Sequence, residues 1–375
     1  MQRAKIPARL QQRLGSADYV LLALFGVWLV FGLIMLTSAS SVIGYNRFGD
    51  TYFFIKRQFF YGVLPGIFAC IFFAKLPYQM FKKCALVVTV VSILLLIVVL
   101  IPGVGLSFNK GARSWLVLGG VSFQPAEFAK LGLIFGLSLF LERLGRRITD
   151  IRQGFLPAIA GGLFFILCVV LQPDIGTASI LFGIILALLF VAGAQVAHIS
   201  ILLLLAAVAF GALIAVAPYR AARFTTFLHP ELDPQGVGYH INQAYYAIGS
   251  GGWLGRGLGY SRQKFQYLPE VHADSIFAIT AEEMGFLFVV IFLFFLFFIT
   301  YRGLQVSASA PDDFGRLFVS GVMCWFVIQS FFNIAAMVGL MPITGVPLPF
   351  VSHGGTALVI SLAAVGGVMN VSRQV

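Results

Sequence analysis

The stretch "SIFAITAEEMGFLFVVIFLFFLFFIT", residues 275–300, decides the fold class of this 375-residue chain. It is long enough to cross the ~30 Å hydrocarbon core of a membrane as one helix. Its front edge is different in character, because "LPEVHAD" (residues 268–274) carries two carboxylates and a histidine there, and Glu282 and Glu283 follow inside the run. Ionisable groups are costly within a membrane span, so their gathering at one end needs an explanation.

Nine further apolar runs of similar length make the chain a membrane protein. The composition agrees, with 59% hydrophobic and 10% charged residues, which excludes a soluble globular protein. We expect an all-α polytopic protein with about ten transmembrane helices, forming a single membrane domain over residues 1–375. "SAS" (residues 38–40) resembles a signal cleavage site, but the long polar lead favours a retained first span. The other runs are 19–39, 58–74, 83–102, 125–142, 155–172, 177–194, 197–217, 316–338 and 355–371.

The basic residues indicate an orientation and not a nucleic-acid partner. The net charge is +11, yet lysines and arginines stand in short loops between spans and form no patch. With the N-terminus inside, fourteen of them face the cytoplasm and five occupy short outer segments, so the bias places both termini in the cytoplasm. A large extracytoplasmic loop, residues 218–274, then joins helices 7 and 8. Its tyrosines and Trp253 predict that it lies on the outer leaflet.

Two familiar kinds of site are excluded by spacing. The four cysteines lie in apolar runs without a CxxC pair, so neither a disulfide framework nor a zinc site is expected. Because the five histidines lack metal-ligand spacing, any metal would have to bind to oxygen ligands. The glycines of "GSGGWLGRGLG" (residues 249–259) do not match a nucleotide-binding motif. They are better explained by tight turns and close backbone packing.

Polar groups near the outer ends of the spans allow two interpretations. Glu127 and Lys130 share one helical face, Asp174 lies at an outer turn, and Asp274 lies at the mouth of the eighth span. These groups either pair within the bundle and cap helices, or line a pocket with Lys130 at its floor. In such a pocket a partly desolvated Asp274 would have a raised pKa, which Lys130 would pull back down, and it could act as a general base. For Glu282 and Glu283, pairing with other polar groups in the core of the bundle is the favoured interpretation.

Several motifs in order resemble the SEDS family of cell-wall polymerases, of the FtsW and RodA type. The lead "SRQKFQYLPE" is more similar to the division branch, FtsW. The motifs cover nearly the whole chain, and they are "SAS" (38–40), "GARSW" (111–115), "QPAEFAK" (124–130), "QPDIGT" (172–177), "GYHINQAYYAIGSGGWLGRGLG" (238–259), "LPEVHADSIFAITAEEMGF" (268–286) and "PLPFVSHGGT" (347–356).

The resemblance implies a peptidoglycan glycosyltransferase that polymerises lipid II at the outer face of the membrane. It places the catalytic carboxylate on Asp274. Basic residues would stabilise the departing pyrophosphate, with Lys130, Arg113 and either Arg256 or Arg262 as candidates. No cofactor is required by this interpretation, although a divalent cation, Mg²⁺ or Mn²⁺, could share that work. The residues expected to bind substrate are Lys130, Glu127, Arg113, Trp115, Glu270 and His272.

The resemblance also implies partners and a location. A division-type polymerase would work with a class B penicillin-binding protein transpeptidase and other division proteins. It would lie in the bacterial cytoplasmic membrane at the division septum. The apolar run 286–298 and the run 318–333, with the small residues Ser320 and Gly321, are the expected docking face.

The chain departs from the family pattern at four positions. Ala273 and Ser275 flank Asp274 where a hydroxyl and an aromatic residue are usual, Ser114 replaces a basic residue before Trp115, and His353 stands where tyrosine is common. Two other functions stay open. A lipid II flippase is compatible with ten spans but should be polar across the whole bilayer, and a scaffold would not need Asp274.

Overall fold

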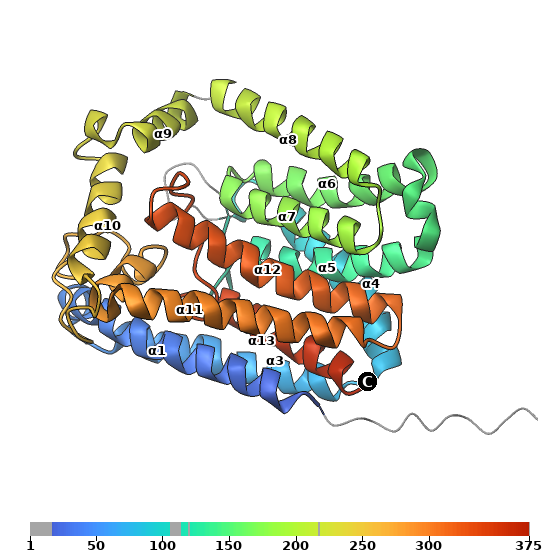
Figure 1. Cartoon of the computed structure of the whole chain (residues 1–375), viewed down its shortest axis with the longest axis horizontal. Helices are drawn as coiled ribbons and strands as arrows, with labels where there is room; N and C mark the ends of the chain where they lie inside the picture. The colour runs from blue at the N-terminus through green and yellow to red at the C-terminus, as the bar shows by residue number, and fades with distance from the viewer. Residues whose placement is uncertain (1–16, 106–113, 119–120, 217, 375) are drawn as a thin grey trace, which may run out of the picture.

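The computed structural model describes residues 17–105, 114–118, 121–216 and 218–374, and its regular structure is almost entirely helical (Figure 1). The helices are α1 (Tyr19–Phe48), α2 (Phe53–Gln58), α3 (Leu64–Lys75), α4 (Tyr78–Val98), α5 (Pro125–Leu144), α6 (Leu156–Val170), α7 (Ile175–Val191), α8 (Val196–Val216), α9 (Pro218–Leu228), α10 (Val237–Gly251), α11 (Ile276–Ala308), α12 (Asp313–Met337) and α13 (Gly355–Ser372). Short π or 3₁₀ turns occupy Phe59–Val63, Gly145–Thr149, Ile151–Phe155 and Pro230–Leu232. A hairpin of β1 (Leu116–Leu118) and β2 (Val121–Phe123) pairs antiparallel, with Val117 opposite Ser122.

The predicted all-α polytopic class is confirmed. Each of the ten apolar runs falls on a helix. Among the described residues, seven helices are long and apolar enough to cross a membrane, and α7 and α8 carry shorter apolar segments. The count of ten crossings and the cytoplasmic position of the termini stay predictions.

The core of the bundle is formed by α12 and α13. About 67% of the apolar window of α12 and 78% of that of α13 are buried, against 22% in α4 and α11. The helix α13 packs against α3, and α12 packs against α5, α7 and α11. Aromatic side chains fill the junctions, with the ring of Phe318 centred 5.1 Å from Phe81 and 4.7 Å from Phe135. The peripheral helices keep apolar faces outward, as lipid-facing helices do.

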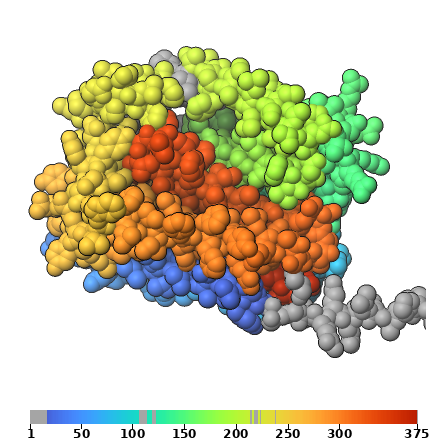
Figure 2. Space-filling view, viewed as in Figure 1, coloured from blue at the N-terminus to red at the C-terminus, as the bar shows by residue number. Residues whose placement is uncertain are grey.

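The segment 218–274 is more regular than the loop that we predicted. It contains α9 and α10, which are joined by a 3₁₀ turn and a short turn over residues 229–236, and residues 252–274 are built of turns and bends. Figure 1 shows α9 and α10 at the end of the bundle where α11 begins, and in Figure 2 their yellow surface covers that end. The segment 218–274 therefore covers the N-terminal end of α11.

Residues 17 and 374, the ends of the described chain, lie at the opposite end of the bundle. The start of α1 meets the end of α13, where the backbone N–H of Asp18 donates to Ser372 Oγ at 3.3 Å (Figure 1). Asp274 and the chain ends are thus separated by the length of the helices.

Candidate active site

A tight turn delivers Asp274 to the start of α11. Glu270 has a positive φ of 50°, and its carbonyl accepts from the N–H of Ala273 at 2.9 Å and of Ser275 at 3.3 Å. The helix then begins at Ile276. This turn points the chain into the bundle directly after the carboxylate.

Contacts from α12 and the segment 338–354 hold the backbone of this turn. Asn333 Nδ2 donates to the carbonyls of Asp274 and Val346, both at 2.8 Å. Ser352 Oγ donates to the carbonyl of Ala273 at 2.6 Å. Because these bonds use backbone oxygens, they fix the position of Asp274 and leave its carboxylate unoccupied.

The carboxylate of Asp274 is buried but weakly satisfied. The residue is 9% exposed, and its hydrogen-bond partner is Ser275 Oγ, at 3.4 Å from Oδ1. Within the part of the chain that the structure describes, no ion pair involves Asp274. Burial, and after it the charge of Glu270, raise the pKa of Asp274 to about 6. A carboxylate with this pKa is ionised at neutral pH and basic enough to take a proton from a substrate.

Glu270 and His272, two predicted substrate-binding residues, flank Asp274 in the same turn. His272 Nε2 lies 3.8 Å from Glu270 Oε2, and its ring packs 4.3 Å from that of Phe54. Burial lowers the pKa of His272 and lowers that of His353 to about 4. Both rings are therefore neutral near pH 7 and offer hydrogen bonds without positive charge.

Glu127 and Lys130 share one helical face, as predicted, and they bind each other. Lys130 Nζ donates to Glu127 at 2.8 Å and to Gln329 Oε1 at 2.7 Å, and it lies 5.1 Å from the centre of the Trp325 ring. Lys130 is 0% exposed. Its charge is therefore compensated in this structure, and it acts at a distance unless the pair opens.

Asp174 belongs to the same polar group. It caps α7, accepting from the N–H of Thr177 at 2.9 Å and from its hydroxyl at 2.8 Å. Burial raises the pKa of Asp174, and the charges of Glu127 and Lys130 act on it in opposite directions. The starts of α5 and α7, together with Gln329 inside α12, thus contribute to one buried polar cluster.

Polar side chains on α12 connect this cluster to Asp274. Gln329, which binds Lys130, also donates to the carbonyl of Pro347 at 2.8 Å. Asn333 lies one helical turn further along α12 and binds the carbonyls of Val346 and Asp274. Sequence reasoning missed both amides, although their i,i+4 spacing inside an apolar run could have indicated a polar face.

The motif "GARSW" is only partly visible. Arg113 lies outside the described residues. Trp115 is half-buried immediately before β1, and Ser114 Oγ donates to the carbonyl of Gln172 at 3.4 Å. The motif therefore reaches the turn that precedes Asp174.

Glu282 and Glu283 form a separate, fully buried network. Glu283 binds Ser38 Oγ at 2.7 Å and Lys264 Nζ at 3.0 Å. Glu282 accepts from the hydroxyl of Ser261 and from the N–H of Arg262 at 2.9 Å. The prediction of a core-pairing role for the two glutamates is confirmed by these bonds.

Arg256, a candidate for binding pyrophosphate, is already engaged in this network. Its Nε lies 3.7 Å from Glu282 Oε1 and donates to the carbonyl of Ser250 at 3.2 Å. The side chain thus helps to attach the turn after α10 to α11.

A break in α11 explains the glycine-rich motif. Gly285 has φ 79° and ψ 175°, so the helix is interrupted there. The N–H of Phe286 donates to the carbonyl of Gly252 at 2.9 Å, and the N–H of Gly257 donates to that of Glu283 at 3.0 Å. A Cβ on Gly255 would lie 2.2 Å from the carbonyl oxygen of Glu283. The glycines therefore serve close backbone packing, as predicted, and not a phosphate.

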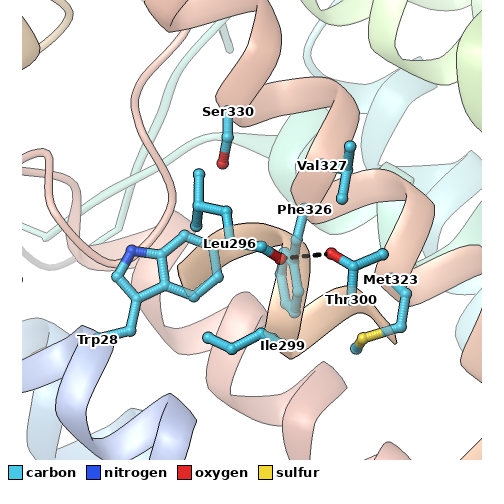
Figure 3. A pocket seen from close by; sticks show the side chains of 8 residues that line it. All are labelled: Trp28, Leu296, Ile299, Thr300, Met323, Phe326, Val327 and Ser330. Atoms are coloured by element: carbon cyan, nitrogen blue, oxygen red, sulfur yellow. Dashed lines mark hydrogen bonds between the residues drawn. The ribbon is translucent and has the colours of Figure 1, made fainter. Parts of the chain in front are cut away.

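Two hollows among the described residues lie away from Asp274. Figure 3 shows a small hollow between α1, α11 and α12 that is lined by Trp28, Leu296, Ile299, Thr300, Met323, Phe326, Val327 and Ser330. None of these side chains is ionisable, and Thr300 Oγ1 donates to the carbonyl of Leu296 at 2.7 Å. An apolar groove follows Ala160–Val170 of α6. Neither offers acid–base chemistry.

The described residues contain no group of three or more His, Cys, Asp or Glu side chains that could hold a metal ion. The participation of a divalent cation in binding the pyrophosphate stays a prediction. The chemistry of the site rests on Asp274, its neighbours in the turn and the Lys130 cluster.

Comparison with known proteins gives a consistent picture over the whole chain. A family of cell cycle proteins that comprises FtsW, RodA and SpoVE matches residues 18–375. Stage V sporulation protein E of Bacillus subtilis is 41% identical over 358 residues, covering 96% of this chain and 97% of that protein. The probable peptidoglycan glycosyltransferase FtsW of Trichlorobacter lovleyi is 37% identical over 360 residues, covering 96% and 94%.

Solved structures share the fold. A chain from a peptidoglycan synthase complex, described as coordinating polymerization and crosslinking, matches with a TM-score of 0.79 and 29% identity, covering 95% of this chain and 98% of that one. The rod shape determining protein RodA of Thermus thermophilus matches with a TM-score of 0.70 and 28% identity, covering 95% and 97%.

Proposed function

Because the chain belongs to the FtsW, RodA and SpoVE family of cell cycle proteins and is a peptidoglycan glycosyltransferase, we propose that Asp274 is its general base. The observation that carries the proposal is the state of this carboxylate. It is buried, lacks a cation partner among the described residues and has a pKa raised to about 6. Such a group is poised to accept a proton near neutral pH.

The proposed reaction joins two lipid II molecules. The 4-hydroxyl oxygen of the GlcNAc in the acceptor attacks the anomeric carbon of the MurNAc in the donor, while its proton passes to Asp274. The bond from that carbon to the phosphate oxygen breaks, and the undecaprenyl pyrophosphate departs with the electron pair. A base at the mouth of a span suits this substrate, because the sugars lie in water while the lipid stays in the bilayer.

The leaving pyrophosphate needs positive charge where its own charge develops. We propose that Arg113 and Arg262 supply it, joined by Lys130 when its bond to Glu127 opens, with Trp115, Glu270 and His272 contacting the sugars. Lys130 has three N–H donors, and Glu127 and Gln329 use two of them. Its further donor is available to substrate only if the buried cluster opens, so Lys130 is placed in a supporting role. No obligatory cofactor is part of this proposal.

We propose that the single membrane domain crosses the bilayer ten times with both termini in the cytoplasm. The start of α1 and the end of α13 lie together, which agrees with an even number of crossings. Asp274 would then face the outer side of the bacterial cytoplasmic membrane, at the division septum.

The proposed partner is a class B penicillin-binding protein, together with other division proteins. The similar solved chain comes from a complex that coordinates polymerization and crosslinking. The apolar face of α11 is open to a partner helix, since Ile291, Phe294 and Phe297 are 56–70% exposed. Ser320 and Gly321 of α12 do not belong to such a face, because Ser320 is bonded to Ser307 at 2.7 Å and Gly321 packs against Ile134 and Leu188.

The test of the function uses purified protein in detergent with labelled lipid II. No bilayer is present, so nothing can be flipped, and glycan polymer formation reports only the transferase. We expect polymer from the native chain, alone or with its transpeptidase partner, and none from Asp274→Asn. Polymer formation by the Asn variant at more than about a tenth of the native rate would remove Asp274 from the role of base, since loss of a general base costs about 10²–10⁴-fold.

A further inference from the structure

The two oxygens of the Asp274 carboxylate have different surroundings. Oδ1 lies 3.4 Å from the hydroxyl of Ser275. Oδ2 faces the backbone of Gly345, where an added Cβ would lie 3.9 Å away. One oxygen is therefore held by a donor, and the other borders a position without a side chain.

The hydroxyl that holds Oδ1 is itself held from another helix. Ser275 is 0% exposed, and its Oγ lies 2.6 Å from Nε2 of His240 on α10. An ionised carboxylate only accepts hydrogen bonds, so the bond between the two residues forms when the Ser275 hydroxyl donates its single hydrogen to Oδ1 of Asp274. His240 must then donate its Nε2–H to Ser275 Oγ. The ionised base thus sets the direction of the whole chain, from His240 through Ser275 to Oδ1.

We propose that His240 and Ser275 are positioning residues that hold Oδ1 of the general base, so that Oδ2 is the oxygen that takes the proton of the attacking hydroxyl, in the space that Gly345 leaves. This inference rests on the proposed role of Asp274. It adds a defined reactive oxygen and assigns α10, part of the long segment 218–274, a function in the chemistry.

With this hydrogen-bond direction, the path from Asp274 through Ser275 to His240 does not act as a proton relay. A relay would pass the proton from Asp274 to Ser275 and on to an unprotonated Nε2. In the ionised state that the base must have before attack, Nε2 carries the hydrogen that it donates to Ser275. The hydrogen bonds from His240 through Ser275 therefore orient the carboxylate of Asp274 and do not carry protons away from it.

Gly345 is suited to its place by conformation as well as by size. Its φ is 72°, in the left-handed region that favours glycine. Gly345→Ala would both strain the backbone and bring a methyl group toward Oδ2. We expect a lower kcat from this variant, because the hydroxyl would be displaced from the base.

Other titratable groups surround the site and must be considered in any pH profile. Glu270 and His272 belong to the same turn, and Glu270 repels the charge on Asp274. His353 of the segment 338–354 is close to His272, with ring centres 5.8 Å apart. Arg47 and Arg57, from α1 and α2, act on these histidines. Replacing Ser275 leaves all of these groups unchanged.

The test measures kcat, KM and the pH dependence of kcat for four variants in the detergent assay. Ser275→Ala should lower kcat about tenfold, the value of one hydrogen bond to a charged group, with little change in KM. It should also move the acid inflection of the profile to higher pH, because the ionised base loses a donor. Ser275→Thr keeps the hydroxyl, and His240→Gln keeps an N–H donor, so both should retain more activity than His240→Leu. Ser372→Ala, a buried serine at the opposite end of the bundle, serves as the control.

An unchanged kcat and inflection in Ser275→Ala would overturn the positioning role. Loss of activity in all four variants together with a lowered melting temperature and an unmoved inflection would also overturn it, since this indicates a merely structural bond. Failure of the underlying function is recognised separately, because in that case Asp274→Asn would itself remain active.

Discussion

Two acidic regions lie close together in the sequence, one in the turn before α11 and one inside α11, and the surrounding residues bind their carboxylates in opposite ways. Glu282 and Glu283, inside α11, are surrounded by donors from α1 and from the turns after α10, including the ammonium of Lys264. Asp274, just before α11, is reached by one side-chain donor, the hydroxyl of Ser275 at 3.4 Å, and has a negative neighbour, Glu270. Burial alone therefore does not make a carboxylate reactive. The supply of donors decides whether it stabilises the fold or accepts a proton.

The largest expected effect comes from exchanging carboxylate for amide in each region. Asp274→Asn should lower the polymerisation rate about 10²–10⁴-fold, because the base is lost, while its melting temperature in detergent should match that of the native protein. Glu282→Gln should show the reverse pattern, with a clear loss of thermal stability and a smaller loss of rate in the fraction that remains folded. Equal effects of both variants on both measurements would contradict the distinction between the two regions.

Lys264→Met tests whether the buried ion pair of Lys264 and Glu283 stabilises the fold. Lys264 and Glu283 have side chains that are 4% and 0% exposed, and removing one partner of such a pair leaves an uncompensated buried charge that costs about 3–5 kcal/mol. The melting temperature should fall strongly, and Lys264→Met combined with Glu283→Gln should recover much of the loss. Lys56→Met is the matched control, since its pair with Asp50 is largely exposed and should contribute little. A control variant as unstable as Lys264→Met would refute this assignment.

The break in α11 at Gly285 separates the short acidic start of the helix from its longer apolar part, and a substitution at Gly285 tests its role. Gly285→Ala places a side chain at a positive φ, which costs about 1–3 kcal/mol, and its Cβ would lie 2.2 Å from the backbone nitrogen of Gly255. We expect a moderate loss of thermal stability and of activity. Gly161→Ala on α6, where a Cβ meets nothing within 4 Å, should be neutral or slightly stabilising. The idea fails if the two variants melt at the same temperature.

The smallest expected effect is a shift along the pH axis. Asp274 must be ionised to act, and its pKa is raised to about 6, so kcat should be steady above that pH and fall about tenfold per unit below it. Glu270→Gln removes a negative charge that raises this pKa, so its inflection should move to lower pH. A profile that is flat between pH 5 and 8 in the native protein, or an upward shift in the variant, would contradict this electrostatic account.

Much of the fold was predictable because membrane insertion depends on local properties. Ten runs of apolar residues predicted ten helices, since a backbone in hydrocarbon must satisfy its own hydrogen bonds. The i,i+3 spacing of Glu127 and Lys130 predicted their shared face. The order of the motifs alone pointed to the polymerase family and to Asp274. The position of Asp274 directly before an apolar run can be read from the sequence.

Contacts between segments that are far apart in the sequence depend on how the helices pack, so only the tertiary structure shows them. The sequence places Asp274 before the apolar run and Glu283 inside it, but it does not show that Ser38 and Lys264 are the groups that bind Glu283. In the same way, Gln329 and Asn333 resemble ordinary residues of an apolar run, and the structure places them between Lys130 and Asp274. Local patterns report the cost of leaving water, which depends on each residue alone, whereas the reactivity of a buried charge depends on which donors from other helices reach it.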